Sequence, residues 1–118
     1  MPKLKRLFLE LNPLGNQGMA ALALALRKLP ALKELHLTDC EIGEGVASLV
    51  ANLGKDDFKK LEYLFLQKNK IGDVGAAKLV AALDAGGLPM LIVCPVSDNP
   101  AITRAVQAVE DALAKRSQ

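Results

Sequence analysis

The side chains best suited to catalysis or metal binding are few in this chain and are scattered along it. There is one histidine, His36, and there are two cysteines, Cys40 and Cys94. A catalytic histidine needs a nucleophile or carboxylate within hydrogen-bond reach, and the nearest candidate here is Glu34, a neighbour on the same strand face. One histidine and two separated cysteines do not make a zinc ligand set. We therefore predict no enzyme activity, no metal and no cofactor, and we expect His36 to act in surface packing.

Two short motifs resemble catalytic or phosphate-binding elements in sequence. Ser97-Asp98-Asn99 resembles the Ser-Asp-Asn element of penicillin-binding enzymes, but their Ser-x-x-Lys and Lys-Thr-Gly motifs do not accompany it. Gly43-Glu44-Gly45 is rich in glycine, but no Gly-Lys-Ser/Thr follows it. Both are better explained as parts of a repeated turn.

That turn belongs to a spacing that organises the whole chain: Leu, two residues, Leu, one residue, Leu, two residues, Asn. The four copies, two of them with substitutions, are Leu4-Leu7-Leu9-Asn12, Leu32-Leu35-Leu37-Cys40, Leu61-Leu64-Leu66-Asn69 and Leu91-Cys94-Val96-Asn99. A fixed period of this length marks structural units that bury their apolar faces only by stacking on one another.

Each unit has the same order of local signals. A period-2 run such as Leu35-His36-Leu37 predicts a strand, a glycine step such as Ile42-Gly43 predicts a turn, and leucines four apart such as Leu22 and Leu26 predict a helix. The second unit has one residue fewer between its glycines. We therefore expect a small distortion at the second helix and a longer surface loop over 54–60.

The full pattern, LxxLxLxxNxIGxxGxxxLxxxL, resembles the leucine-rich repeat. The third unit matches at Leu61, Leu64, Leu66, Asn69, Ile71, Gly72, Gly75, Leu79 and Leu83. The repeat length and paired glycines are similar to the ribonuclease-inhibitor-like class, which includes ribonuclease inhibitor, the Ran GTPase-activating protein and the repeat domains of NOD-like receptors. The resemblance covers nearly the whole chain. It implies an α/β leucine-rich-repeat solenoid, a right-handed β-α superhelix with parallel strands on the concave wall and helices on the convex wall.

On this basis residues 1–118 form a single leucine-rich-repeat domain with repeats at about 4–31, 32–60, 61–90 and 91–118. The last repeat is cap-like: Pro95 interrupts its strand, and its helix, about 103–115, has a polar outer face. The apolar side of that helix consists of Ile102, Val106, Val109 and Leu113. Nothing precedes Leu4 that would cover the first unit. We expect a C-terminal part of a longer repeat protein, a module packing this N-terminal face on another chain, or a free-standing four-repeat domain.

The asparagines that end each spacing should satisfy backbone groups of neighbouring turns. Cys40 replaces one of them and is a much weaker donor, so the second turn should be less firmly held. Both cysteines are expected to be small buried residues, which fits a reducing compartment weakly.

Outward-facing strand residues are the candidate binding site. The residues between the second and third leucines, Phe8, His36, Phe65 and Pro95, should line up about 5 Å apart, and Tyr63 shares their side. Exposed aromatics favour a partner surface, although strand propensity alone also explains aromatics here. A polar rim would surround them. The partner-binding prediction comprises Arg6, Phe8, Glu10, Glu34, His36, Asp39, Tyr63, Phe65, Gln67 and Lys68.

The function we predict is a non-enzymatic protein–protein interaction module with its partner on the concave face. The alternatives are a regulatory repeat domain of the GTPase-activating or NOD-like-receptor type, and a structural subunit docking through the N-terminal face. A net charge of +2 is too small to favour nucleic acid or an anionic membrane surface. No apolar run approaches the ~20 residues of a membrane span, so we expect no membrane insertion and a cytoplasmic location.

Overall fold

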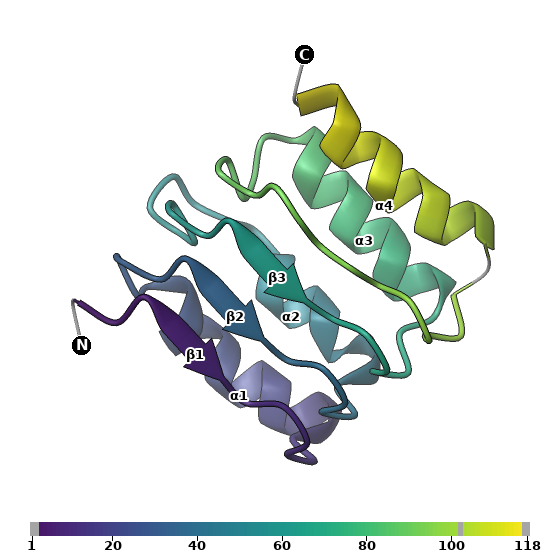
Figure 1. Ribbon diagram of the computed structural model, residues 1–118, viewed down its shortest axis with the longest axis horizontal. Helices are drawn as coiled ribbons and strands as arrows, with labels where there is room; N and C mark the ends of the chain where they lie inside the picture. The colour runs from purple at the N-terminus through teal and green to yellow at the C-terminus, as the bar shows by residue number, and fades with distance from the viewer. Residues whose placement is uncertain (1–2, 102, 117–118) are drawn as a thin grey trace.

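Three short strands form a parallel sheet in the order β1-β2-β3. The computed structural model describes residues 3–101 and 103–116. The strands are β1 (Arg6–Phe8), β2 (Glu34–His36) and β3 (Tyr63–Phe65). Their register aligns Leu7 with Leu35 and Leu35 with Leu64, so equivalent positions of successive spacings lie side by side (Figure 1).

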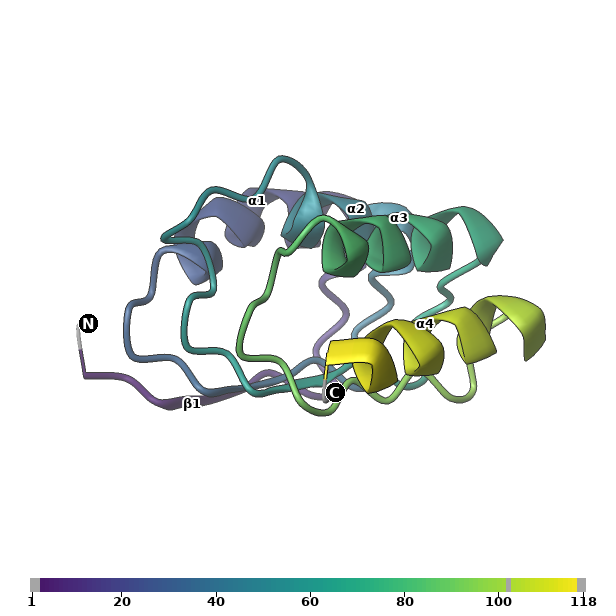
Figure 2. The ribbon, with the colours of Figure 1, turned by 90° about the horizontal axis from the view of Figure 1, so that it is seen from above.

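Helices cover one face of this sheet. They are α1 (Gly15–Arg27), the 3-10 turn η1 (Gly43–Gly45), α2 (Val46–Val50), α3 (Asp73–Asp84) and α4 (Thr103–Arg116). Seen from above, α1, α2 and α3 share a layer opposite the strands, whereas α4 lies nearer the level of the sheet (Figure 2). Parallel strands need such crossover connections, and each crossover here supplies a helix.

The core lies between the two layers and consists mainly of the repeated leucines. Leu35 and Leu37 are fully buried, as are Leu64 and Leu66 within about a percent. The expected α/β repeat arrangement of parallel strands and helices is thus confirmed. The described body measures 37 × 36 × 21 Å. A solenoid of four repeats, with concave and convex walls and a superhelical coil, stays a prediction.

The second unit carries the expected distortion. Its helix consists of the three-residue turn η1 followed by five residues of α2, compared with thirteen residues in α1 and twelve in α3. The one-residue deletion shortens the approach to the helix, and Ala51 leaves it in an extended conformation. Leu53, four residues after Leu49, therefore lies outside the helix.

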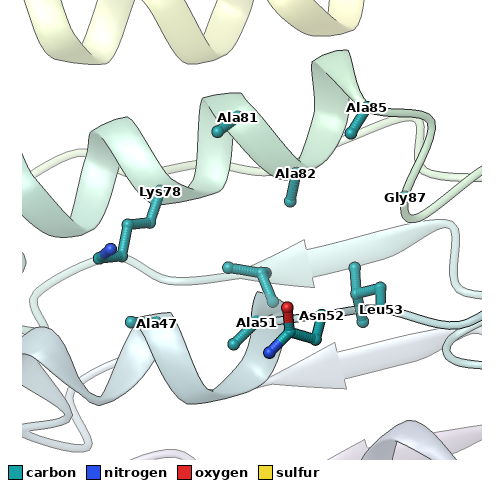
Figure 3. A pocket seen from close by; sticks show the side chains of 10 residues that line it. Ala47, Ala51, Asn52, Leu53, Lys78, Ala81, Ala82, Ala85 and Gly87 are labelled. Atoms are coloured by element: carbon teal, nitrogen blue, oxygen red, sulfur yellow. The ribbon is translucent and has the colours of Figure 1, made fainter.

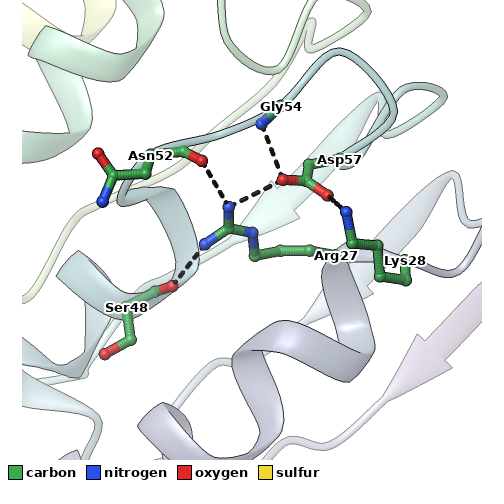
Figure 4. Close-up of polar contacts among 6 residues, drawn as sticks. All are labelled: Arg27, Lys28, Ser48, Asn52, Gly54 and Asp57. Carbon is green, nitrogen blue, oxygen red and sulfur yellow. Dashed lines mark hydrogen bonds and ion pairs between the residues drawn. The ribbon is translucent and has the colours of Figure 1, made fainter.

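The loop that follows is longer, as expected, but it is not simply a surface loop. Phe58 is 1% exposed and Asp57 is 3% exposed. Asp57 accepts a hydrogen bond from Arg27 (2.8 Å) and one from the Gly54 amide (2.8 Å), and it also pairs with Lys28. The Arg27 guanidinium donates in addition to the carbonyls of Ser48 (3.3 Å) and Asn52 (3.0 Å) (Figure 4). A buried ion pair thus fastens the loop to the end of α1.

The asparagine positions tie successive turns together. Asn69 Oδ1 accepts from the Cys40 amide (2.8 Å) and the Ile42 amide (3.5 Å), while its Nδ2 donates to the Leu37 carbonyl (2.6 Å). Asn99 repeats this arrangement one unit later, accepting from the Asn69 and Ile71 amides. The expected role of these asparagines is confirmed.

Cys40 faces a different turn from the one we expected it to affect. Its Sγ donates to the Leu9 carbonyl (3.0 Å), which mimics one bond of asparagine. An asparagine here would turn its amide oxygen to the first turn, as Asn69 and Asn99 do to the turns before them. Sulfur is a weaker acceptor; it hydrogen-bonds to the Asn12 backbone, while the Leu14 amide donates to the Asn12 carbonyl (2.7 Å). The second turn is held by Asn69, so our expectation that it would be loose was wrong.

The fourth unit pairs with β3 without forming a full strand. Val93 makes an isolated parallel bridge with Tyr63, and the Pro95 carbonyl accepts from the Leu66 amide (3.0 Å). Proline has no N–H with which to return a ladder bond, so pairing is reduced to a bridge where the spacing predicted a strand. The expected final helix is present as α4, which packs against α3. Ile102, predicted on its apolar side, lies outside the described residues.

Candidate functional site

The sheet face turned away from the helices carries a continuous stack of three rings. Strand residues alternate between the two faces, and Leu7, Leu35 and Leu64 point into the core. The Phe8 and His36 rings are 4.3 Å apart between centroids with an interplanar angle of 24°. The His36 and Phe65 rings are 4.4 Å apart at 13°. We call these three residues the aromatic stack.

The stack is accessible from solvent. The Phe8 side chain is 58% exposed, although it is large and apolar, and His36 and Phe65 are half-buried. None of the three is in the core, so the prediction that they project outward agrees with their positions. Stacked rings on one rigid sheet present apolar area whose geometry is set before any partner arrives.

Arg6 and Glu34 lie beside the stack on the same face of the sheet, and hydrogen bonds link them to it. Glu34 Oε1 lies 3.1 Å from His36 Nε2, and Glu34 Oε2 accepts from Arg6 Nε at 3.0 Å. The hydrogen bond with His36 lowers the pKa of the Glu34 carboxyl, and the Arg6 guanidinium lowers it further. Glu34 is thereby held ionised and in place between a ring and a cation.

The remaining predicted residues surround these two rows. Tyr63 is half-buried and pairs with Glu34 in the sheet register. Gln67 lies beyond β3 and accepts a hydrogen bond from the Thr38 hydroxyl (3.0 Å). Sequence reasoning missed Thr38, although it follows Glu34 and His36 in the same period-2 pattern.

Asp39 and Lys68 occupy equivalent positions just after their strands. Both are exposed, and both have positive φ, 57° in each case. The Asp39 amide donates to the Gln67 carbonyl (3.0 Å), which links the two turns through the backbone. Glu10 is half-buried next to the corresponding first turn. The ten predicted residues therefore form a central group on the strands and a rim on the turns at the strands' carboxyl ends.

The surroundings of the histidine and of the two cysteines bear on reactivity and on metal binding. His36 has one carboxylate neighbour, Glu34, and lies between two phenyl rings. Within residues 3–101 and 103–116, no three His, Cys, Asp or Glu side chains are grouped as metal ligands. Burial raises the pKa of the Cys94 thiol to about 12 and also raises that of Cys40, which makes both poor nucleophiles.

A hollow of about 550 Å³ lies on the helical side, between α2 and α3 (Figure 3). Alanines make up half of its lining residues, and Lys78 is its charged member. The hollow exists because α2 ends at Val50, whereas α3 continues beside it to Asp84. Without convergent polar groups it does not have the form of a ligand site. Over the described ranges, no helix is both long and apolar enough to cross a membrane.

Comparison with known proteins bears on the repeats. A family model described as Leucine Rich repeat matches residues 1–23, 28–50 and 59–80, more than half of the chain. Leucine-rich repeat-containing protein 42 of Xenopus tropicalis is 32% identical over 80 residues, which are 66% of this chain and 19% of that protein. Tonsoku-like protein of Bos taurus is 36% identical over 91 residues, 75% of this chain and 7% of that protein. The chain thus spans less than a fifth of each of these curated relatives.

Proposed function

The chain belongs to the leucine-rich repeat family, and on that premise we propose that it is a non-enzymatic module that binds a protein partner on its outward sheet face. Leucine-rich repeat domains generally mediate protein–protein interaction. The observation that carries the proposal is the aromatic stack of Phe8, His36 and Phe65, which lies on solvent-accessible sheet although the core does not need it.

Preorganisation is the physical reason to expect useful affinity from a small patch. Binding through loose side chains loses about 0.5–1.5 kcal/mol for each rotamer-rich side chain that becomes immobilised. Here His36 is already held between two rings and by Glu34. A partner that covers the stack would therefore gain apolar burial with little further ordering.

The surrounding charges would set orientation and association rate. Arg6 and Glu34 form an ion pair whose Arg6 side chain is 67% exposed, and the exposed Asp39 and Lys68 add charges of both signs. A rim of mixed sign selects the pose of a partner more than it adds to affinity. We expect a partner with an apolar or aromatic centre and charged groups around it.

A capture experiment with paired variants tests this proposal. The double variant Phe8→Ser with Phe65→Ser should lose most of the protein recovered by the parent chain from native lysate. Leu24→Ser is the matched control, because Leu24 is 66% exposed on α1, in the helical layer. Retention of the same protein by the double variant, with far-UV circular dichroism unchanged, would exclude the outward face as the binding site.

A GTPase-activating role is the regulatory alternative, and it requires a loop arginine that can reach a phosphate. Arg27 is buried against Asp57, Arg6 is paired with Glu34 on a strand, and Arg104 lies within α4. No arrangement among these favours that role, and membership of the ribonuclease-inhibitor-like class also stays a prediction.

A further inference from the structure

We propose that the amino-end edge of the sheet is a second binding surface, which takes a linear segment of a protein partner with acidic side chains next to apolar ones. By amino-end edge we mean residues that lead into the strands, on the side of the sheet where β1, β2 and β3 begin (Figure 1). They are Lys5, Lys33, Lys59, Lys60, Met90 and Ile92. The aromatic stack is not part of this surface, and the proposal does not require a partner on the stack.

Backbone hydrogen bonds hold the first row of this edge in register. The Lys33 amide donates to the Lys5 carbonyl (2.8 Å), and the Glu62 amide donates to the Lys33 carbonyl (2.9 Å). The Ile92 amide donates to the Glu62 carbonyl (2.9 Å) and completes the row. Chain segments paired in this way lie about 4.8 Å apart. Lys5 and Lys33 are therefore direct neighbours, and the fold fixes the order of charged and apolar positions along the edge.

The lysines of the edge form a basic surface that the chain does not neutralise by ion pairing. Each of them is exposed, and within residues 3–101 and 103–116 none of them forms an ion pair. Lys5 and Lys33 are closer to each other than the Debye length of about 8 Å at physiological ionic strength. Their fields therefore add in the solvent in front of the edge.

The opposite ends of the strands do not repeat this concentration of positive charge. The exposed residues that begin the turns there are Leu11, Asp39, Lys68 and Asp98. Their charges alternate in sign from one unit to the next. Lys70, in the same region, is paired with Glu41 at 3.1 Å. The basic surface is thus particular to the amino ends of the strands.

The fourth unit places exposed apolar side chains where the other units have charged ones. Ile92 is 59% exposed at the position that Lys33 and Glu62 occupy in their units. Met90 is 52% exposed at the position of Lys60. Neither belongs to the core. Large apolar side chains that are exposed close together are typical of binding surfaces.

The two halves of the edge together specify the occupant. Acidic side chains would lie over Lys5 and Lys33, and adjoining apolar side chains would cover Ile92. Glu62 stands in the row between these two parts. Its carboxylate would repel a uniformly negative partner such as nucleic acid or an anionic membrane, whereas a peptide can place an uncharged residue over it. An acidic–apolar segment of a protein is therefore the partner that fits.

Fluorescence anisotropy with a synthetic peptide tests the proposal. The probe is a fluorescein-labelled peptide in which a run of Glu and Asp is followed by a run of Leu and Phe, and the reversed sequence is also measured. The control peptide has Gln and Asn in place of the acids. We expect the acidic peptide to bind the parent chain about ten-fold or more tightly than the control peptide. Raising the ionic strength from about 0.1 M to about 1 M should remove most of this difference, because the Debye length falls from about 10 Å to about 3 Å.

Charge reversal locates the binding. Lys5→Glu with Lys33→Glu should weaken binding of the acidic peptide by about ten-fold or more, and Lys5→Gln with Lys33→Gln should weaken it less. Lys78→Glu with Lys115→Glu is the matched control, because it changes the net charge equally at exposed positions on α3 and α4. The control pair should bind the peptide nearly as well as the parent chain. Far-UV circular dichroism would verify the fold of each variant, and the Gln pair keeps the test valid if the Glu pair is unfolded.

The apolar half of the edge has its own pair of variants. Ile92→Ser should weaken binding of the peptide by about ten-fold, because it removes the side chain that the Leu and Phe residues would cover. Val74→Ser is the matched control, since Val74 is an exposed β-branched residue on α3. It should leave the affinity for the peptide unchanged.

Local losses in both halves of the edge, with unchanged controls, support the proposal. It is overturned if the acidic peptide does not bind, if the control peptide binds equally well, or if the two charge-reversal pairs weaken binding equally. A loss in Phe8→Ser with Phe65→Ser but not at the edge would place the peptide on the aromatic stack, which overturns this proposal and leaves the proposed function intact. Binding of the parent chain to phosphatidylserine vesicles or to a DNA oligonucleotide, lost in Lys5→Glu with Lys33→Glu, would assign the edge to a membrane or to nucleic acid instead.

Discussion

Replacing Asp57 by alanine should lower the free energy of unfolding by about 3–5 kcal/mol, the cost of leaving one partner of a buried ion pair alone. The Arg27 guanidinium is the group left behind. Its side chain is 6% exposed, and after the substitution it would keep only the carbonyls of Ser48 and Asn52 as partners. Its Nε atom already lacks a hydrogen-bond partner in the described region.

This loss is a substantial fraction of the free energy of unfolding of a typical domain, ~5–15 kcal/mol. Urea unfolding at pH 7, followed by far-UV circular dichroism, would measure it. Lys70→Ala is the matched control. It removes an ion pair to Glu41 of 3.1 Å whose side chains are 70% and 46% exposed, and such pairs contribute less than about 1 kcal/mol.

A double replacement separates the charge effect from the loss of contacts. Arg27→Met with Asp57→Leu removes both charges and keeps apolar volume, so it should recover much of the stability lost in Asp57→Ala. A loss of stability in Asp57→Ala no greater than that in Lys70→Ala would contradict this prediction. So would a double variant that is less stable than Asp57→Ala alone.

Three further predictions concern the same framework. Hydrogen bonds from Lys28 and Arg27 hold the pKa of Asp57 well below its usual range, so the unfolded state binds the proton more readily than the folded state. The ionised Asp57 carboxylate therefore stabilises the folded state. Its contribution is complete above the unfolded pKa of about 3.9 and declines as pH falls below it. Acid unfolding of Asp57→Asn should accordingly show a shallower loss of stability below about pH 4 than the parent. Asn69→Ala removes both the acceptor for two amides and the donor to two carbonyls at a fully buried position, and should cost more than about 2 kcal/mol in urea unfolding. Cys40→Asn replaces a weak sulfur acceptor beside the first turn by an amide oxygen and should stabilise by about 0.5–1.5 kcal/mol, whereas no gain in the urea midpoint would contradict this prediction.

Much of the framework could be predicted from periodicity, because the constraints are local. The alternation around His36 placed a strand with one buried and one outward face, and the lost residue near Gly45 predicted the weakened second helix. Asp57 could not be foreseen in the same way. It lies in a loop without periodic pattern and its partner Arg27 is 30 positions away, so no spacing connects the two.

The candidate site shows the same division. Its members follow from strand alternation, but the contact geometry does not. That Phe8, His36 and Phe65 stack at 4.3 and 4.4 Å depends on the exact register of three strands, and the bond from Glu34 to His36 depends on side-chain rotamers. We predicted that Cys40 would affect the second turn, whereas its position faces the first turn. Each asparagine oxygen accepts hydrogen bonds from backbone amides of the preceding unit, and the sequence alone does not show which of the two neighbouring units it contacts.

Photo-crosslinking from position 8 tests most directly the central claim that the outward sheet face binds a protein partner. A photoreactive phenylalanine analogue would replace Phe8 on the sheet face in one chain and Leu24 on α1 in another, and crosslinked products would be compared at equal expression. We predict one discrete protein adduct from position 8, lost when Phe65→Ser is added, and none from position 24. The same adduct from position 24, or none from position 8 while the partner still binds, would contradict it.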